Sequence, residues 1–204
     1  INRLLWRVHE LDPAWAPPAH GLDLAKHQQI LAARLASLDG IVAELARDEL
    51  AEIVELTSKI NSLGHRITGL AQAAAPTLLL LPGVGPLTAA KLVGETAGVT
   101  RFKSEAAFAR HAGIAPIPVW SGNTAGRVRL TRSGNRQLNA AVHRVAITQI
   151  RLDGLGKTYY LKKKAQGMST PEALRCLKRR LARIIFNHLT TDHTAVATHL
   201  AAAA

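Results

Sequence analysis

A short segment with two glycines and two prolines, Leu81–Val93, has the composition of a loop that could bind a phosphate group. Gly83 and Gly85 can adopt positive φ angles and place no side chain between the backbone and a ligand. Pro86 suits the first position of a helix, whose first amides lack partners within the helix and favour an anion. We predict a phosphate contact, independent of nucleotide sequence, at Gly83, Val84, Gly85, Leu87, Thr88 and Lys91.

A serine surrounded by arginines follows further along the chain. Ser121 stands between Trp120 and Gly122, ahead of Arg127, Arg129, Arg132 and Arg136. Arginine can bind two oxygens of a phosphodiester at once, which would polarise the phosphorus that a serine attacks. Residues 106–152 contain no Asp or Glu, so no acidic base is close in sequence, and a loop serine without a base or metal is more often structural. Ser133 is a second candidate nucleophile, although its place before Gly134 and Asn135 fits a helix cap better.

The third group of candidate residues lies on a basic helix near the C-terminus. Apolar residues recur there at steps of three and four, which predicts a buried stripe made by Leu174, Leu177, Leu181, Ile184 and Ile185. The basic residues between them would face outward. We predict that Lys178, Arg179 and Arg180 contact a nucleic-acid backbone. The alternative is a face that is merely solvated.

The charge of the whole chain favours a polyanionic partner. The net charge is +12, and residues 101–204 carry 18 of the 26 Lys and Arg but only 4 of the 14 Asp and Glu. Displacing counterions from phosphates favours the binding of such a region, although a basic protein that is merely soluble remains the alternative. We expect no membrane association, because no apolar run is long enough to cross a bilayer. The single cysteine, Cys176, cannot form an internal disulfide, which indicates a reducing cytoplasm.

Composition and periodicity predict an all-α fold. The chain is 48% hydrophobic but only 4% aromatic, so Ala, Leu, Val and Ile must form the core, and Ala and Leu are strong helix formers. No long stretch alternates with period two, so we expect no sheet. The fold class is therefore a coiled coil or helical hairpin followed by a small helical domain that contains the glycine loop.

The expected elements follow from periodicity and from breaks in it. We predict helices over residues 1–11, 102–114, 135–150, 158–166 and 170–189, with Asp23 and Thr170 as helix caps. Residues 116–134 should form a long linker. The expected domains are residues 1–21, the end of an N-terminal domain and its linker; 22–75, a coiled coil; 76–190, the glycine-loop domain; and 191–204, a frayed tail.

The segment 31–70 positions no candidate site residue but defines the architecture. Its apolar residues keep steps of three and four, with one phase shift near Glu49: Leu31, Leu35, Leu38, Val42 and Leu45, then Ile53, Leu56, Ile60, Leu63, Ile67 and Leu70. Asp39-Gly40 favours a division into two helices. A helical hairpin in one globular core and a projecting coiled coil that forms a dimer are both consistent with this pattern.

Two resemblances connect these observations. Leu81–Val93 resembles the helix-hairpin-helix motif of DNA-repair and junction-binding proteins. The order of that loop, then Arg101-Phe102 and Phe108–Gly113, then the Ser121-Gly122 loop, then Gly134-Asn135-Arg136 with Leu138-Asn139, is similar to the C-terminal half of the IS-one-ten family of insertion-sequence transposases. Residues 2–13 are similar to the segment that leaves the N-terminal domain of that family. The resemblance covers about residues 1–190.

The family resemblance implies a mechanism and partners. Members pair a RuvC-like domain, whose four acidic residues hold Mg²⁺, with a C-terminal domain that carries a nucleophilic serine. It implies that Ser121 attacks a DNA phosphate and forms a covalent phosphoserine link. It also implies a structured guide RNA, a homo-oligomer joined through the coiled coil, and a bacterial, nucleoid-associated location. The acidic domain is absent from this sequence, so we expect no cofactor here, Mg²⁺ in the full-length enzyme, and DNA or RNA binding without cleavage by this chain alone.

Two functions of other classes compete with the transposase prediction. One is a non-catalytic helix-hairpin-helix module that only binds nucleic acid. The other is a structural protein that dimerises through the coiled coil and whose charge merely keeps it soluble. For the glycine loop itself, the alternative is a tight turn between two helices. Nucleic-acid affinity separates the two functions, because phosphate binding should be strongest at low salt.

Overall fold

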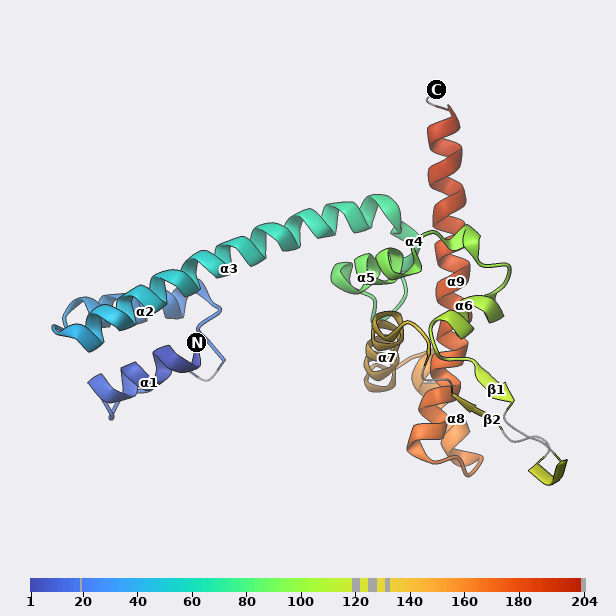
Figure 1. The fold of residues 1–204 in the computed structure, drawn as a ribbon, viewed down its shortest axis with the longest axis horizontal. Coiled ribbons are helices and arrows are strands. Elements are labelled where there is room, and N and C mark those ends of the chain that lie inside the picture. Colours follow the sequence, from blue (N-terminus) through green and yellow to red (C-terminus); the bar gives the residue numbers. More distant parts are fainter. Residues whose placement is uncertain (19, 119–121, 125–127, 131–132, 203–204) are drawn as a thin grey trace. The chain divides into compact units, whose positions relative to one another are not determined.

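The computed structural model describes residues 1–18, 20–118, 122–124, 128–130 and 133–202. The chain forms two compact units, Ile1–Arg66 and Ile67–Ala204 (Figure 1). The described residues contain nine α-helices, two short 3₁₀ helices and one pair of three-residue strands. The predicted all-α fold is therefore confirmed in its main part, and the expectation of no sheet is wrong for one short ribbon.

The first unit is built from α1 (Asn2–Leu11), α2 (Ala25–Ala36) and the beginning of α3 (Ile41–Ala74). The helices bury one another's apolar residues, among them Leu4, Leu31, Leu35 and Leu50. The predicted division of the apolar seam is confirmed, because α2 ends before Asp39 and Gly40 adopts a φ of +100° ahead of α3.

The ends of α2 are satisfied in a way that the sequence did not indicate. Its N-cap is Leu24, which makes no side-chain capping bond, so the prediction that Asp23 caps this helix is wrong. At the other end, Nη1 of Arg47 donates to the carbonyl oxygens of Leu35 and Leu38, at 2.8 and 2.9 Å. The carbonyl of Leu35 also accepts from the amide of Leu38, and the guanidinium from α3 adds a second link across the turn between the two helices.

The later part of the apolar seam on α3 is not covered within the described chain. Leu56, Ile60 and Leu63 follow steps of four and three and are exposed, with Ile60 at 67%. Leu31 and Leu35 are instead buried in the core of the first unit. The two parts of the predicted seam therefore have different environments.

The second unit is organised around α9 (Thr170–Ala202). This helix packs against α4 (Pro76–Leu79), the 3₁₀ helix η1 (Val99–Arg101), α6 (Glu105–His111), α7 (Arg136–Arg151) and α8 (Leu155–Ala165), while α5 (Pro86–Thr96) packs on α7 (Figure 1). Phe108, Leu138, Val142, Leu181 and Ile185 are fully buried at its centre. Burying such side chains contributes about 1.5–3 kcal/mol each relative to exposure.

The C-terminal helix differs from its prediction at both ends. Ser169 precedes α9, and its amide and hydroxyl both donate hydrogen bonds to the Glu172 carboxylate, so Ser169 rather than Thr170 is the capping residue. The helix also continues to Ala202, beyond its predicted end at residue 189. Asp192 is 1% exposed there and accepts hydrogen bonds from the amides of Thr77 and Leu78, at 2.9 and 3.2 Å. This bridge connects α9 at Asp192 to the start of α4.

The predicted linker 116–134 contains the unexpected ribbon. Strand β1 (Pro116–Pro118) pairs antiparallel with β2 (Val128–Leu130), with Pro116 opposite Leu130. Strands of three residues are too short to show a period of two, and prolines at both ends of β1 argue against a strand. The 3₁₀ helix η2 (Gly122–Thr124) lies between them in the chain.

Two helices of this unit begin at capping residues close to the predicted starts. Ser104 caps α6 by accepting from the amide of Ala107, so this helix is shorter than the predicted 102–114. Asn135 caps α7 by accepting from the amide of Leu138 at 2.9 Å. The interpretation of Ser133 as the cap is therefore wrong by two residues.

Candidate nucleic-acid interface

The glycine loop between α4 and α5 uses its two glycines differently. Gly83 has a φ of +85°, and a Cβ added there would lie 3.1 Å from Cβ of Thr148 and 3.2 Å from the carbonyl oxygen of Val145. Gly85 is extended, with a φ of −88°, and a Cβ there would meet open space. Positive φ is therefore confirmed at Gly83 alone, and only Gly83 is required by packing against α7.

A buried glutamine fixes this loop to the rest of the unit. Nε2 of Gln149, a residue 8% exposed on α7, donates to the carbonyl oxygen of Pro82 at 2.8 Å. A Cβ added to Gly156 would lie 2.3 Å from Oε1 of the same glutamine. Gln149 therefore joins the glycine loop to the start of α8. Sequence reasoning missed it, although a polar residue in the apolar stripe of a helix was an available signal.

The residues of the loop that we predicted to contact phosphate differ in their exposure to solvent. Leu87 is 64% exposed, Lys91 is partly exposed, and Val84 and Thr88 are buried. The amide of Ala89 is the first in α5 to bond within the helix, to the carbonyl of Gly85 at 2.9 Å. The preceding amides of Leu87 and Thr88 are thus the ones without helix partners, and the buried Thr88 side chain contributes to the core.

A close backbone contact marks where the serine segment leaves the core and returns to it. A Cβ added to Gly134 would lie 2.3 Å from both Cα and N of Gly113. Nδ2 of Asn139 donates to the carbonyls of Ala112 and Gly113, at 2.8 and 3.2 Å. The amide of Asn135 donates to the carbonyl of His111 at 2.7 Å. Residues 114–133 therefore begin and end at one fixed point, which we call the glycine clamp (Gly113, Gly134 and Asn139).

Lys178 belongs to this clamp region rather than to a solvated face. Its Nζ donates to Oδ1 of Asn139 at 2.6 Å, and burial lowers the pKa of Lys178 below its ordinary value. The pKa of His143 is also lowered, first by burial and then by the nearby charge of Lys178. Lys178 thus fixes Asn139 in the orientation that holds the clamp.

The serine prediction falls largely outside the described residues. Trp120, Ser121, Arg127 and Arg132 are among the residues that the structure does not describe. Only the backbone of Arg129 is described, in the middle of β2. Arg136 is exposed in the first turn of α7. The nucleophilic role of Ser121 stays a prediction.

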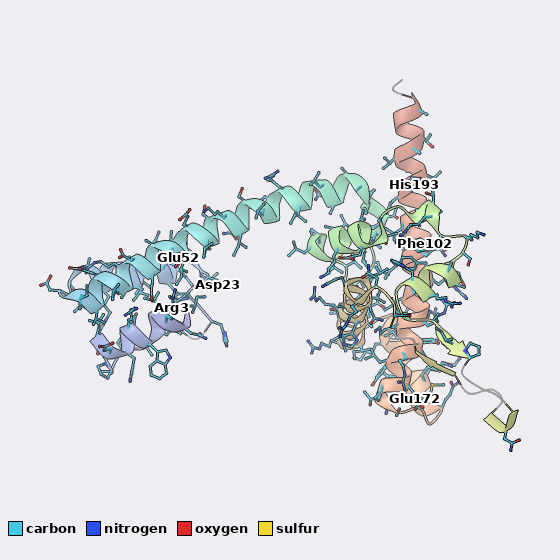
Figure 2. The ribbon with its side chains drawn as sticks, in the orientation of Figure 1. Arg3, Asp23, Glu52, Phe102, Glu172 and His193 are labelled. Carbon is cyan, nitrogen blue, oxygen red and sulfur yellow. The ribbon has the colours of Figure 1, made fainter. Side chains whose placement is uncertain are left out.

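The basic residues of α9 divide between different environments. Arg180 is exposed, and its guanidinium lies 4.8 Å from the ring centre of Tyr159. Arg179 is partly buried, and its Nη1 meets no hydrogen-bond acceptor among the described residues. Both arginines line a cavity of about 1000 Å³ between β1, α8 and α9. The cavity lies near the start of α9, where Figure 2 labels Glu172. Lys178, Arg179 and Arg180 therefore do not share one outward face of α9, as the sequence had predicted.

Within the described part of the chain, no group of three His, Cys, Asp or Glu side chains is placed to hold a metal ion. In the same residues, no helix combines the length and apolarity needed to cross a bilayer. The features that the second unit does offer are backbone amides at a helix start, clustered arginines and a lined cavity.

Comparison with known proteins shows which family this unit is similar to. Residues 75–161, within this helical unit, match the family model described as "Transposase IS116/IS110/IS902 family". The match covers the glycine loop, the clamp, the serine segment and most of α8.

Relatives from insertion elements extend the similarity over most of the chain. An uncharacterized 44.8 kDa protein of insertion element IS116 from Streptomyces clavuligerus is 29% identical over 82% of this chain and 42% of its own length. Corresponding proteins of IS110 from Streptomyces coelicolor and IS900 from Mycobacterium paratuberculosis are each 30% identical, over 80% and 83% of this chain and 40% and 41% of their own.

The chain therefore carries the C-terminal region of the IS110/IS116/IS900 family of transposases, which confirms the resemblance found in the sequence. It spans about two fifths of the length of the curated relatives that it matches.

Proposed function

We propose that this chain is the DNA-binding and strand-joining region of an insertion-sequence transposase, with Ser121 as the nucleophile. The observation that carries the proposal is the family match over residues 75–161, which includes Ser121 and its neighbouring arginines. The excess of Lys and Arg after residue 100 supports it, because a DNA backbone is the partner that such a charge favours.

The proposed step is a transesterification. The Oγ of Ser121 forms a bond to a DNA phosphorus as its proton is lost, and the departing strand oxygen takes up a proton to become a free hydroxyl, so that the phosphoserine link conserves the phosphodiester energy. Arg129 and Arg136 would offer charge-assisted hydrogen bonds to the phosphate oxygens. The described residues of this chain do not fit a Mg²⁺ site, so we assign them no part in binding a metal.

Substitution of Ser121 in the full-length transposase tests this step. Ser121→Ala should still bind DNA but form no covalent protein–DNA adduct, as detected by denaturing electrophoresis of labelled DNA. Ser133→Ala is the matched control and should form the adduct. Adduct formation by the Ser121→Ala protein would rule out the assignment, and its loss in Ser133→Ala alone would transfer the role to that serine.

A second candidate function is binding without catalysis through the glycine loop. The observation that favours it is the open space at Gly85, next to the unpartnered amides of Leu87 and Thr88. Gly85→Val should leave the fold intact and block access to these amides, which would weaken binding to duplex DNA at least fivefold. Unchanged affinity would exclude the loop as a helix-hairpin-helix contact.

We also propose two partners besides DNA. A second copy of the chain would cover the exposed residues Leu56, Ile60 and Leu63 of α3, because their spacing is that of a coiled-coil seam. A structured guide RNA would bind the full-length protein, as the family resemblance implies.

A further inference from the structure

The cavity between β1, α8 and α9 contains more positive charge than the fold neutralises. Its lining includes five cationic side chains, Lys163, Arg175, Arg179, Arg180 and Arg183, and one acidic side chain, Glu172. The Glu172 carboxylate is already bonded to Ser169, which lowers the pKa of Glu172 and keeps it ionised. Among the described residues, Arg183 alone of the four arginines has an ion pair, with Glu105 at 2.8 Å.

Three of these arginines form a row along α9. Arg175, Arg179 and Arg183 are four residues apart, which places them on one face at intervals of about 6 Å. Like charges at this spacing destabilise a helix. A row of this kind without acidic residues between its members is stabilised when an anion with several charges lies along it.

Arg179 adds a specific unmet requirement. Its Nη1 is buried without an acceptor among the described residues, so the fold leaves part of this charged group unsatisfied. The side chain of Arg179 also lines the cavity, where a phosphate oxygen would match its guanidinium group in geometry. The wall of the cavity therefore includes a guanidinium group that an entering anion could bind.

The other walls of the cavity are suited to a flat, weakly polar group. Tyr159 of α8 contributes an aromatic ring with the Arg180 guanidinium 4.8 Å from its centre, and both kinds of plane stack on nucleobases. Pro116, Met168 and Ile184 supply apolar contacts. A volume of about 1000 Å³ exceeds what one ion needs and matches the upper range for pockets that enclose organic ligands.

We propose that this cavity binds an unpaired nucleotide segment of a nucleic-acid strand, with its phosphates on Arg175 and Arg179 and a base against Tyr159. A paired base cannot reach such a wall, because its faces are covered by its neighbours in the stack. The inference rests on the proposed function and adds that this surface distinguishes a single strand from a duplex. The strand is either DNA or RNA, since both present the same phosphate and base chemistry.

The first test compares two arginines that carry the same charge in different places. Arg179→Gln changes the cavity, whereas Arg151→Gln removes an exposed charge of α7 that does not line it. Binding of fluorescent oligonucleotides to the 204-residue chain is measured by anisotropy. Arg179→Gln should weaken single-strand binding at least tenfold and duplex binding no more than Arg151→Gln does. Equal losses on single strands for the two variants would overturn the proposal.

The only cysteine of the sequence gives an independent readout of the same cavity. Cys176 lines it, so an oligonucleotide bound there should slow alkylation of the thiol at least fivefold. The protection should disappear in Arg179→Gln. An alkylation rate that saturating single-stranded oligonucleotides leave unchanged would contradict the proposal.

Further outcomes separate the possible failures. Arg179→Gln should not lower the melting temperature, because the substitution removes an unpartnered group. If the Arg179→Gln protein does not fold, the variant Arg175→Gln, at an exposed position, replaces it in both measurements. Salt-sensitive duplex binding without protection of Cys176 would reject the cavity and leave the proposed function standing. No binding to any polynucleotide would reject both. Tighter binding of RNA than DNA, with the same loss in Arg179→Gln, would identify RNA as the strand.

Discussion

The glycine clamp has no room for even one additional carbon atom between its two backbone segments. Gly113 and Gly134 lie in backbone contact, and Asn139 ties the same turn to α7. Because residues 114–133 start and finish at this contact, the clamp determines where the arms of β1 and β2 begin. A methyl group at residue 134 would have to move the backbone of residue 113.

We predict that Gly134→Ala lowers the free energy of unfolding by about 3 kcal/mol, the upper range for overpacking. Gly94→Ala is the matched control, because that glycine lies inside α5 with open space around it, and alanine there should stabilise the helix by about 1 kcal/mol. Urea denaturation measures both. A Gly134→Ala protein as stable as the parent would mean that the contact with Gly113 is not tight.

Sequence reasoning identified glycines at the hairpin loop because their local pattern is distinctive, but it could not identify this clamp. Gly113 and Gly134 are separated by a linker of irregular composition, and their contact depends on the packing of both α6 and α7 against α9. The same holds for Gln149, whose partner, Pro82, is distant in sequence. Lys178 looked like a surface cation because helical periodicity gives its direction but not the polar group, Asn139, that meets it.

At the scale of elements, α4 is a helix of four residues that α9 holds in place. Such a short helix is not stable alone, since forming its first turn costs more than one hydrogen bond returns. The carboxylate of Asp192 bonds to two of its first amides, and His188 lies 3.1 Å from the hydroxyl of Thr77. The start of the glycine-loop hairpin is therefore positioned from the far end of the chain.

We predict that Asp192→Ala lowers the free energy of unfolding by about 2 kcal/mol, because it removes a cap and leaves two buried amides unsatisfied. Asp153→Ala is the control, since its carboxylate is exposed and pairs only with Lys157. Thermal and urea unfolding of both variants check this. Equal stability of the two would show that solvent replaces the cap.

The exposed seam of α3 leads to a prediction about assembly. Ile60→Lys should shift the protein to monomers, because a charge in a coiled-coil seam is buried without a partner. Leu155→Lys changes an even more exposed leucine outside the seam and should leave the mass unchanged. Multi-angle light scattering at several concentrations distinguishes the two, and a dimer that persists in Ile60→Lys would place the contact between copies elsewhere.

The apolar periodicity of α3 predicted a seam, yet the sequence left open whether it faces a core or a partner. Helix periodicity gives the face and not what covers it. Leu31 and Leu35 proved to be core residues of the first unit, whereas the same spacing at Leu56 and Ile60 is uncovered in the described chain. The bounds of the helices were predictable within a few residues wherever Gly, Pro or a capping residue interrupts the pattern.

At the scale of the whole molecule, the chain has two hydrophobic cores rather than one. One contains Leu4, Leu31 and Leu35, and the other contains Phe108, Leu181 and Ile185. We therefore expect the two units to unfold in separate cooperative transitions, because unfolding is cooperative among residues that pack in the same core.

We predict that Leu35→Ala lowers the stability of the first unit by about 2–5 kcal/mol and leaves the unfolding of the second unit unchanged. Leu181→Ala is the reciprocal variant and should affect the second unit alone. Hydrogen exchange read by mass spectrometry follows peptides from each unit in one experiment. A loss of protection in both units from either substitution would show that the molecule unfolds as one.

The bridge from Asp192 to the start of α4 has a consequence for how such genes can be shuffled. Residues 75–161, the stretch with the family match, do not contain the carboxylate that secures their own first helix. A chimaera that exchanges this stretch between relatives must bring along a compatible acceptor some thirty residues past its end. The unit that can be exchanged intact is thus the stretch together with α9. A crossover between them would separate the amides at the start of α4 from the Asp192 carboxylate that accepts their hydrogen bonds.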